Sequence, residues 1–434
     1  MDALHSEIKK IFKSRFSHKL FIPGESLVPV SGKVFDEKEL INMVNAVMEG
    51  WWTEGKYAAE FERSLADFLG LKFCVAVNSG SSANLLALSA LTSFRLPDEK
   101  RLKKGDEVIT VAAGFPTTVN PIIQNGFIPV FVDVMLGTYN ASLESIKKAI
   151  TPKTKAVFIA HTLGNPFEVA ELRKICDEYN LWFIEDNCDA LGSKYNGQFT
   201  GTFGHISTCS FYPAHHITMA EGGAILTNDP ILSKIVRSLR DWGRDCVCST
   251  GVDNFCKNRF NWKLGDLPQG YDHKYIYSEI GYNLKITDIQ AALGLVQLDK
   301  LPKFIQKRKD NFAYLYAAFK KLEKYFILPS WNSEADPSWF GFLLTIKPEA
   351  GFSREGLLKY LNDKKIGTRL LFAGNVTKQP YFKNYNINYR ISGDLKNTDE
   401  VMNNTFWIGV YPGLTKEMLG YAIESFSKFI EEYE

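Results

Sequence analysis

Short apolar segments alternate with amphipathic ones between about residues 70 and 230. Five of these segments are rich in β-branched or aromatic residues and have the length of buried strands: residues 75–77, 107–111, 128–132, 156–160 and 181–184. Stretches with helical periodicity lie between them, at residues 82–91, 143–149 and 168–179. Strands separated by helices need right-handed crossovers. The pattern therefore predicts an α/β fold, with a mostly parallel sheet that carries helices on both faces.

Polar residues follow four of the predicted strands directly: Asn78, Asp133, His161 and Asp186. Ligands of such sheets bind at the carboxyl ends of the strands. We therefore expect the functional residues to gather at this edge.

At 434 residues the chain is too long for one compact core. We predict an N-terminal arm (residues 1–40), a large domain (41–295) and a smaller C-terminal α+β domain (296–434). The C-terminal part has helix patterns at residues 289–304, 354–364 and 416–433 and a strand pattern at 340–346. Residues 246–277 have little apolar periodicity and contain three cysteines, and so long an irregular loop indicates a function.

Composition excludes several classes of function. A net charge of +2 gives no electrostatic case for binding nucleic acid or an anionic membrane. The first residues lack the basic and then apolar run of a secretory signal, and no stretch approaches the roughly 20 apolar residues of a bilayer span. We expect a cytoplasmic protein with no membrane or nucleic-acid partner.

The segment Asn78-Ser79-Gly80-Ser81-Ser82 follows a predicted strand and opens an alanine- and leucine-rich helix. Its backbone N–H groups and hydroxyls are suited to bind a phosphate at the helix N-terminus. Helix capping alone explains the same residues.

Four of the seven cysteines form the pattern Cys-x57-Cys-x-Cys-x7-Cys: Cys188, Cys246, Cys248 and Cys256. Four thiolates complete a shell for zinc or for an iron–sulfur cluster, and the spacing alone does not choose between these metals or exclude scattered buried thiols. The other three, Cys74, Cys176 and Cys209, lie in strand or helix patterns and are expected in the core.

A series of motifs in the same order resembles the DegT/DnrJ/EryC1 family of nucleotide-sugar aminotransferases. These motifs lie at residues 52–55, 61–62, 78–83, 131–134, 185–186, 221–223, 281–285 and 288–294. The resemblance implies the aspartate-aminotransferase-like fold, known as fold type I of the pyridoxal phosphate enzymes, for the large domain. It also implies a pyridoxal or pyridoxamine phosphate cofactor.

The resemblance assigns cofactor-binding roles to single residues. It implies that Gly80, Ser81 and Ser82 bind the phosphate. Asp186 would pair with the pyridine nitrogen and make the ring an electron sink, although a strand-end aspartate also caps turns. Phe115 would stack on the ring, or else be a plain core phenylalanine.

Asn283 and Lys285 resemble residues that reach the cofactor phosphate across a dimer interface. This implies a homodimer with shared sites, whereas an exposed polar turn is the alternative.

His215 occupies the position of the lysine that holds the cofactor covalently in the aminotransferases. Counting from Ser210-Phe211 and back from Glu221-Gly222-Gly223 selects His215 and not His216. Without that amine the cofactor would be pyridoxamine phosphate, bound non-covalently. An imidazole can still remove and return a proton.

The histidine and the cysteine spacing together resemble the iron–sulfur-dependent 3-dehydrases of nucleotide-linked 4-keto-6-deoxyhexoses, the branch of CDP-4-keto-6-deoxyglucose 3-dehydrase. In that branch the four cysteines hold a 2Fe–2S cluster. The resemblance implies C3 deoxygenation in the biosynthesis of 3,6-dideoxysugars for lipopolysaccharide. A separate NAD(P)H-dependent flavin and iron–sulfur reductase would supply the electrons.

Two alternatives stay open at this point. One is a cluster-free sugar 3-dehydratase that obtains its amine from an amino acid such as glutamate. The other is a non-catalytic binding protein with a transaminase fold and a structural zinc. Iron content and sugar conversion distinguish them.

Overall fold

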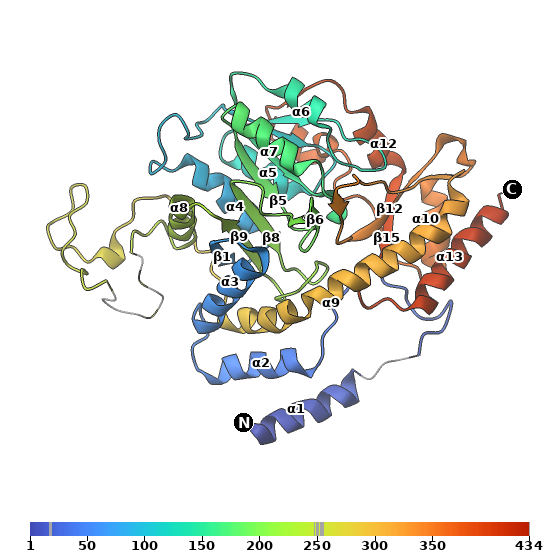
Figure 1. Ribbon diagram of the computed structural model, residues 1–434, viewed down its shortest axis with the longest axis horizontal. Helices are drawn as coiled ribbons and strands as arrows, with labels where there is room; N and C mark the ends of the chain where they lie inside the picture. The colour runs from blue at the N-terminus through green and yellow to red at the C-terminus, as the bar shows by residue number, and fades with distance from the viewer. Residues whose placement is uncertain (17–19, 247, 249–250, 252–255, 434) are drawn as a thin grey trace.

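The computed structural model describes residues 1–16, 20–246, 248, 251 and 256–433. Its centre is an eight-stranded sheet (Figure 1). In spatial order the strands are β1 (Phe73–Val77), β9 (Gly223–Thr227), β8 (Ile206–Ser210), β5 (Trp182–Asp186), β4 (Thr154–Ala160), β2 (Glu107–Val111), β3 (Ile128–Val132) and β14 (Arg390–Ile391). Each of the five predicted strands appears in it.

The sheet is mostly parallel, as predicted. From β8 to β14 each neighbouring pair is parallel, while β9 runs antiparallel to both β1 and β8. The sequence patterns did not indicate β8 or β9. Their short segments, ISTCS and GAILT, mix Ser, Thr, Cys and Gly with few large apolar residues, although both are buried.

Helices cover both faces of the sheet (Figure 1). Those of the N-terminal and central parts are α1 (Asp2–Arg15), α2 (Glu37–Met48), α3 (Lys56–Leu69), α4 (Gly80–Ser89), α5 (Pro116–Gln124), α6 (Leu143–Ala149), α7 (Val169–Glu178) and α8 (Pro230–Arg240). The predicted helices at residues 82–91, 143–149 and 168–179 correspond to α4, α6 and α7.

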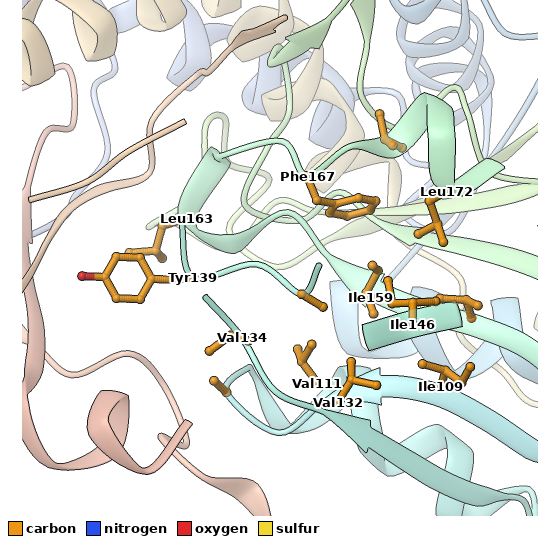
Figure 2. Close-up of a cluster of buried hydrophobic side chains, with 14 of the residues drawn as sticks. Ile109, Val111, Val132, Val134, Tyr139, Ile146, Ile159, Leu163, Phe167 and Leu172 are labelled. Atoms are coloured by element: carbon orange, nitrogen blue, oxygen red, sulfur yellow. The ribbon is translucent and has the colours of Figure 1, made fainter. Parts of the chain in front are cut away.

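Successive strand residues pack into different cores, because side chains along a strand alternate between the two faces. Ile109 and Phe183 belong to the cluster under α6 and α7, which Figure 2 shows with Val132, Ile159 and Leu172. The residues beside them in sequence, Val108 and Ile184, point to the opposite face and pack with α4 and α8. Full burial of both faces explains why these strands read as continuous apolar runs.

The C-terminal part forms a second core around a four-stranded antiparallel sheet. Its strands are β10 (Phe326–Ile327), β12 (Gly341–Ile346), β15 (Thr405–Gly409) and β13 (Thr368–Arg369). The helices of this part are α10 (Arg354–Asp363), α11 (Pro380–Asn384), α12 (Lys396–Asn404) and α13 (Lys416–Glu431). A three-stranded sheet joins β11 (Ala335–Asp336), β6 (Lys194–Tyr195) and β7 (Gln198–Phe199).

One long helix, α9 (Asp288–Phe319), connects the two cores. Its first half packs with α3, and residues near its end, such as Phe312 and Phe319, lie in the C-terminal core. The predicted helix ended at residue 304, but α9 continues past its internal Pro302. The proposed division at residues 295 and 296 therefore falls inside a continuous helix, and it stays a proposal.

The segment between α8 and α9 extends outward from the body (Figure 1, yellow). Within its described residues, the only helix or strand is the short 3-10 helix η3 (His273–Tyr275), as the irregular sequence predicted. The other 3-10 helices are η1 (Ala90–Thr92), η2 (Thr162–Gly164), η4 (Lys320–Leu322), η5 (Pro348–Ala350) and η6 (Val376–Lys378). None of the helices in the described part of the chain is both long and apolar enough to span a membrane.

Asp288, the first residue of α9, also caps the N-terminus of α3. Oδ1 of Asp288 accepts hydrogen bonds from the backbone N–H groups of Gly55 and Ala58 at 2.7 and 3.0 Å. Oδ2 accepts a third, from Tyr57 at 3.3 Å. Gly55 is the N-cap of α3 but has no side chain to cap it, so the carboxylate of Asp288 takes that role.

We expect Asp288→Ala to lower the free energy of unfolding by about 3 kcal/mol, because it leaves buried N–H donors without an acceptor. Asp299→Ala, at an exposed position of the same helix, should change it by less than about 0.5 kcal/mol. Urea unfolding followed by circular dichroism measures both. Equal effects of the two substitutions would show that Asp288 does not hold α3.

Candidate active site

A cavity of about 730 Å³ opens at the carboxyl ends of the parallel strands. Its wall contains four of the seven residues predicted to bind the cofactor, Gly80, Ser81, Phe115 and Asp186, together with the predicted catalytic residue His215 and the predicted metal ligand Cys188. The rest of the wall comes from segments far apart in the chain and includes Ser31, Glu221, Phe340, Arg369 and Trp407. Of the four polar residues expected at this edge, Asp186 lines the cavity, whereas Asn78, Asp133 and His161 do not.

One end of the cavity is formed by the start of α4. Ser79 is the N-cap of this helix, and its Oγ accepts a hydrogen bond from the N–H of Ser82 at 3.1 Å. The hydroxyl of Ser82 donates to Oδ1 of Asn78 at 2.6 Å, and Ser82 does not line the cavity. Gly80 and Ser81 do line it, and N–H groups of a first helical turn have no acceptor within the helix. This end of the cavity is suited to bind an anion.

A side chain larger than hydrogen does not fit at Gly80. A Cβ atom there would lie 2.4 Å from Cβ of Ser210 on β8. The helix start and the sheet are therefore in direct backbone contact, which keeps the anion-binding turn in a fixed position.

Asp186 ends β5 and is 4% exposed. Its Oδ2 accepts hydrogen bonds from Nδ2 of Asn84 at 2.9 Å and from Oγ1 of Thr118 at 2.8 Å. Its Oδ1 accepts from the N–H of Cys188 at 3.1 Å. Thr208 in turn donates to Asn84 at 2.6 Å. The carboxylate is thus fixed from three elements and still borders the cavity.

Phe115 extends into the cavity instead of the core. Its side chain is half exposed (51%), and its ring packs edge-on against Phe372 at 5.5 Å. The prediction left a core phenylalanine open as an alternative, and the exposure of this ring argues against that alternative. An exposed aromatic face beside a carboxylate and an anion-binding turn is suited to a charged planar ring.

His215 lines the cavity opposite this wall, with 16% of its side chain exposed. Its Nδ1 lies 3.5 Å from Oδ1 of Asp189, although the two atoms are not aligned for a hydrogen bond. Arg308, from α9, donates to the backbone oxygen of His215 at 3.1 Å. Burial, with the nearby charge of Arg308, lowers the pKa of His215 to about 3.

Burial raises the pKa of Asp189 to about 8, and the carboxylate of Asp186 adds to this shift. At neutral pH the His215–Asp189 pair therefore carries no net charge. The imidazole is uncharged and able to accept a proton. Burial thus favours the neutral form of the His215 imidazole at neutral pH.

The anion-binding turn, the fixed carboxylate and the exposed aromatic ring together fit a pyridoxamine phosphate cofactor. Gly80 and Ser81 would meet its phosphate, Asp186 its ring nitrogen, and Phe115 its ring face. Among the described residues that line the cavity, none is a lysine. The described wall therefore offers no lysine amine for the covalent attachment of the cofactor that aminotransferases use.

Asn283 and Lys285 do not line the cavity of their own chain. Nζ of Lys285 donates to Oδ1 of Asn283 at 2.7 Å and lies 3.5 Å from the ring centre of Trp242. Burial lowers the pKa of Lys285. Their predicted role at the phosphate therefore requires a second subunit and stays a proposal.

The four cysteines of the spacing pattern do not lie together. Cys188 is on the cavity wall next to Asp186. In the described part of the chain, one group of side chains has donor atoms within 4.8 Å of one another: Cys246, Cys248 and His273. Sγ of Cys256 lies 3.1 Å from Nε2 of the same His273. Cys246, Cys248 and His273 could thus hold a metal ion, and neither Cys256 nor Cys188 is in that group. Cys74, Cys176 and Cys209 are buried as predicted.

Several residues near the site were not identified by sequence reasoning. Asn84 and Thr118 fix Asp186, and they follow predicted motifs by only a few positions. Sequence reasoning assigned Asp189 no role. His161, a candidate from its place after a strand, is instead a core residue: it is 0% exposed and pairs with Glu185 at 2.9 Å. Asp133 is also structural, because it accepts hydrogen bonds from Thr398 and Asn397 at the start of α12.

The fold and the cavity are those of a fold type I pyridoxal phosphate enzyme. The model of the DegT/DnrJ/EryC1/StrS aminotransferase family matches residues 35–427. The chain belongs to this family.

Similar proteins include sugar dehydratases. "Lipopolysaccharide biosynthesis protein RfbH" of Salmonella typhimurium is 58% identical over 413 residues, which are 95% of this chain and 94% of that protein. The dTDP-4-dehydro-2,6-dideoxy-D-glucose 3-dehydratase of Saccharopolyspora spinosa is 52% identical over 410 residues, covering 94% of this chain and 88% of that one. The structure of E. coli GDP-4-keto-6-deoxy-D-mannose-3-dehydratase with bound hydrated PLP superposes with a TM-score of 0.81 at 31% identity, over 92% of this chain and 98% of the other.

The raised pKa of Asp189 predicts a loss of stability as the pH rises from 6.5 to 8. A carboxyl whose pKa is about 8 in the folded state and roughly 3.9 in the unfolded state stabilises the fold most at low pH. Its contribution disappears as the pH passes through the folded pKa. His215 does not offset this loss, because above pH 6.5 it is mainly uncharged in both states.

In Asp189→Asn we expect this decline to be smaller than in wild type by on the order of 1 to 2 kcal/mol. Urea unfolding at the two pH values measures the difference. Asp299→Asn, at an exposed position, should follow wild type. An unchanged pH dependence in Asp189→Asn would mean that Asp189 is ionised in the folded protein.

Proposed function

We propose that this chain is a pyridoxamine-phosphate-dependent 3-dehydrase of a nucleotide-linked 4-keto-6-deoxyhexose. The observation that carries the proposal is that His215 lines a cavity whose described wall contains no lysine; the sequence resemblance puts His215 at the position of the aminotransferase lysine. The fixed carboxylate, aromatic ring and anion-binding turn are all present around it. Two of the similar proteins are named as 3-dehydratases of nucleotide-linked keto sugars.

When bound, pyridoxamine phosphate supplies an amine for the C4 ketone of the sugar and a ring that accepts electrons. Gly80 and Ser81 hold the phosphate at the start of α4. Asp186 holds the ring nitrogen and keeps it protonated, because Asn84 and Thr118 prevent its carboxylate from turning away. Phe115 covers one face of the ring.

His215 is the proton-transfer residue. Its Nδ1 lies near Asp189; in the tautomer with the ring proton on Nδ1, Nε2 has the lone pair that would take a proton from the carbon that carries the cofactor's amine and return it later. The neutral imidazole has a lone pair for the first of these steps. Arg308 and Asp189 act on His215 and are positioning residues.

The reaction breaks the bond between C3 of the sugar and its hydroxyl oxygen, which leaves as water. Two electrons and two protons are needed to give a 3,6-dideoxy-4-keto sugar. We propose that they come from NAD(P)H through a flavin and iron–sulfur reductase. A 2Fe–2S cluster would supply single electrons, with Cys188, Cys246, Cys248 and Cys256 as the ligands that the sequence resemblance implies. The sequence resemblance implies CDP or dTDP as the nucleotide, with CDP favoured.

We further propose that the enzyme works as a homodimer. Asn283 and Lys285 lie outside the cavity of their own chain, and they would complete the phosphate site of a partner subunit. A cluster-free dehydratase is the second candidate, because the E. coli enzyme of similar fold carries PLP and Cys188 shares no group of metal-capable side chains with the loop cysteines among the described residues.

Conversion of the sugar tests the proposal. The purified protein is incubated with pyridoxamine phosphate and the CDP-, dTDP- or GDP-linked 4-keto-6-deoxyhexose, with and without a reductase, and products are analysed by mass spectrometry. We expect loss of one oxygen at C3 only with the reductase. Loss with glutamate alone favours the cluster-free dehydratase. Retention of the oxygen under every condition contradicts both.

Because His215 transfers a proton and does not hold the cofactor, its substitution should lower the conversion rate but leave the affinity for pyridoxamine phosphate nearly unchanged. In His215→Asn the conversion rate should fall by at least about 100-fold, while the affinity for pyridoxamine phosphate, measured by fluorescence quenching, stays within a few-fold of wild type. The neighbouring His216 does not line the cavity and bonds to the backbone of Ser338. His216→Asn should lose less than about 10-fold, and the reverse order would exclude His215 as the base.

A further inference from the structure

The wall of the cofactor cavity carries positive side-chain charge at one position among the described residues. That residue is Arg369, and the wall contains no other arginine and no lysine. The remaining acidic and basic groups include three carboxyls, of Asp186, Asp189 and Glu221, and the uncharged imidazole of His215. An anionic substrate that enters this cavity therefore meets a positive side chain of this subunit only at Arg369.

The guanidinium of Arg369 is available to a ligand. The side chain is exposed, and within the described part of the chain no ion pair joins it to an acidic residue. Its Nη1 donates to the backbone oxygen of Thr368, the preceding residue, at 2.8 Å. Because a guanidinium has five N–H donors in a planar fork, most of them remain for a bound molecule.

The backbone of Arg369 is held by the sheet of the C-terminal part. Arg369 ends β13 and lies opposite Trp407 of β15 in the antiparallel register. Nε1 of Trp407 donates to the backbone oxygen of Leu370 at 3.1 Å. A side chain on a paired strand is positioned more precisely than one on a loop. The C-terminal part thus presents Arg369 to the cavity from a fixed place.

The residues after Arg369 turn towards the residue that would cover the cofactor ring. Phe372 has a φ of 47°, in the left-handed region that a phenylalanine rarely adopts. Its ring packs edge-on against Phe115 at 5.5 Å between ring centres. The N–H of Ala373 donates to the backbone oxygen of Gly114 at 3.3 Å. The segment that begins at Arg369 therefore borders the proposed place of the cofactor ring.

The cavity has room for a substrate beside the cofactor. Its volume of about 730 Å³ lies within the range of roughly 300–1,000 Å³ for pockets that hold drug-sized ligands, and pyridoxamine phosphate has only one six-membered ring and one phosphate. The turn at Gly80 and Ser81 is suited to that phosphate. Arg369 belongs to the other core, so the cavity has separate features for two anionic groups.

We propose that Arg369 binds the diphosphate of the nucleotide-linked substrate and so positions the sugar beside the cofactor. The inference rests on the proposed function for the nature of the substrate. The planar fork of an arginine pairs with phosphoryl oxygens through two parallel hydrogen bonds. Because CDP, dTDP and GDP share the diphosphate, this contact contributes affinity without selecting the base.

Calorimetric titration of the full-length protein loaded with pyridoxamine phosphate, with CDP as the probe, tests this role. In Arg369→Gln we expect the affinity for CDP to fall by at least about 10-fold, and that for dTDP and GDP by a similar factor. Arg369→Lys keeps the charge without the fork and should lie between wild type and Arg369→Gln. The affinity for pyridoxamine phosphate should stay within a few-fold of wild type in both variants.

Lys364→Gln is the matched control. It removes the same charge from an exposed position of the C-terminal part that does not line the cavity, and it should bind CDP as wild type does. In the conversion assay Arg369→Gln should raise KM by at least about 10-fold and change kcat much less, because the contact lies away from the reacting carbons.

Unchanged affinity for CDP in Arg369→Gln overturns the inference and leaves the proposed function in place. An equal loss in Lys364→Gln also overturns it, because the effect would then follow net charge alone. A parallel loss of affinity for pyridoxamine phosphate would assign Arg369 to the cofactor instead. If wild-type protein binds pyridoxamine phosphate but none of the three nucleoside diphosphates, the nucleotide-linked substrate of the proposed function is contradicted together with the inference.

Discussion

The carboxylate of Asp186 lies in the interior, at the carboxyl end of a central strand, because donors from three separate elements surround it. Asn84 comes from α4, Thr118 from α5, and the N–H of Cys188 from the chain that leaves β5. Each of these elements also forms part of the cavity wall. The hydrogen bonds that make burial of the carboxylate tolerable therefore also fix the positions of the anion-binding turn, the exposed Phe115 and the segment that carries Asp189.

The second constraint is the balance of charge around His215. Arg308 and Asp189 are both buried, and burial lowers the pKa of Arg308 to about 9 while it raises that of Asp189. The imidazole between them is neutral. A lysine in this position would add a positive charge beside Arg308. The change from lysine to histidine thus fits its surroundings electrostatically, and it replaces a covalent attachment by a base with a free lone pair.

Sequence patterns were sufficient for the parts of the fold that have strong periodicity. The buried parallel strands and α4, α6 and α7 were predicted closely, and the motif order placed Gly80, Ser81, Phe115, Asp186 and His215 in one cavity. Patterns did not show β8 and β9, whose small and polar residues are buried by neighbours distant in sequence. They also did not show that His273 lies beside Cys246 and Cys248, because spacing along a chain carries no information on how an irregular loop folds back.

The central claim is that the cofactor binds here without a covalent bond, with His215 in the lysine's position. Borohydride reduction in the presence of pyridoxal phosphate, followed by peptide mass spectrometry, tests it directly. The account predicts no labelled peptide from the wild-type cavity and a label at position 215 in His215→Lys. A stoichiometric label on any lysine of the wild-type protein, removed by competition with pyridoxamine phosphate, would contradict it.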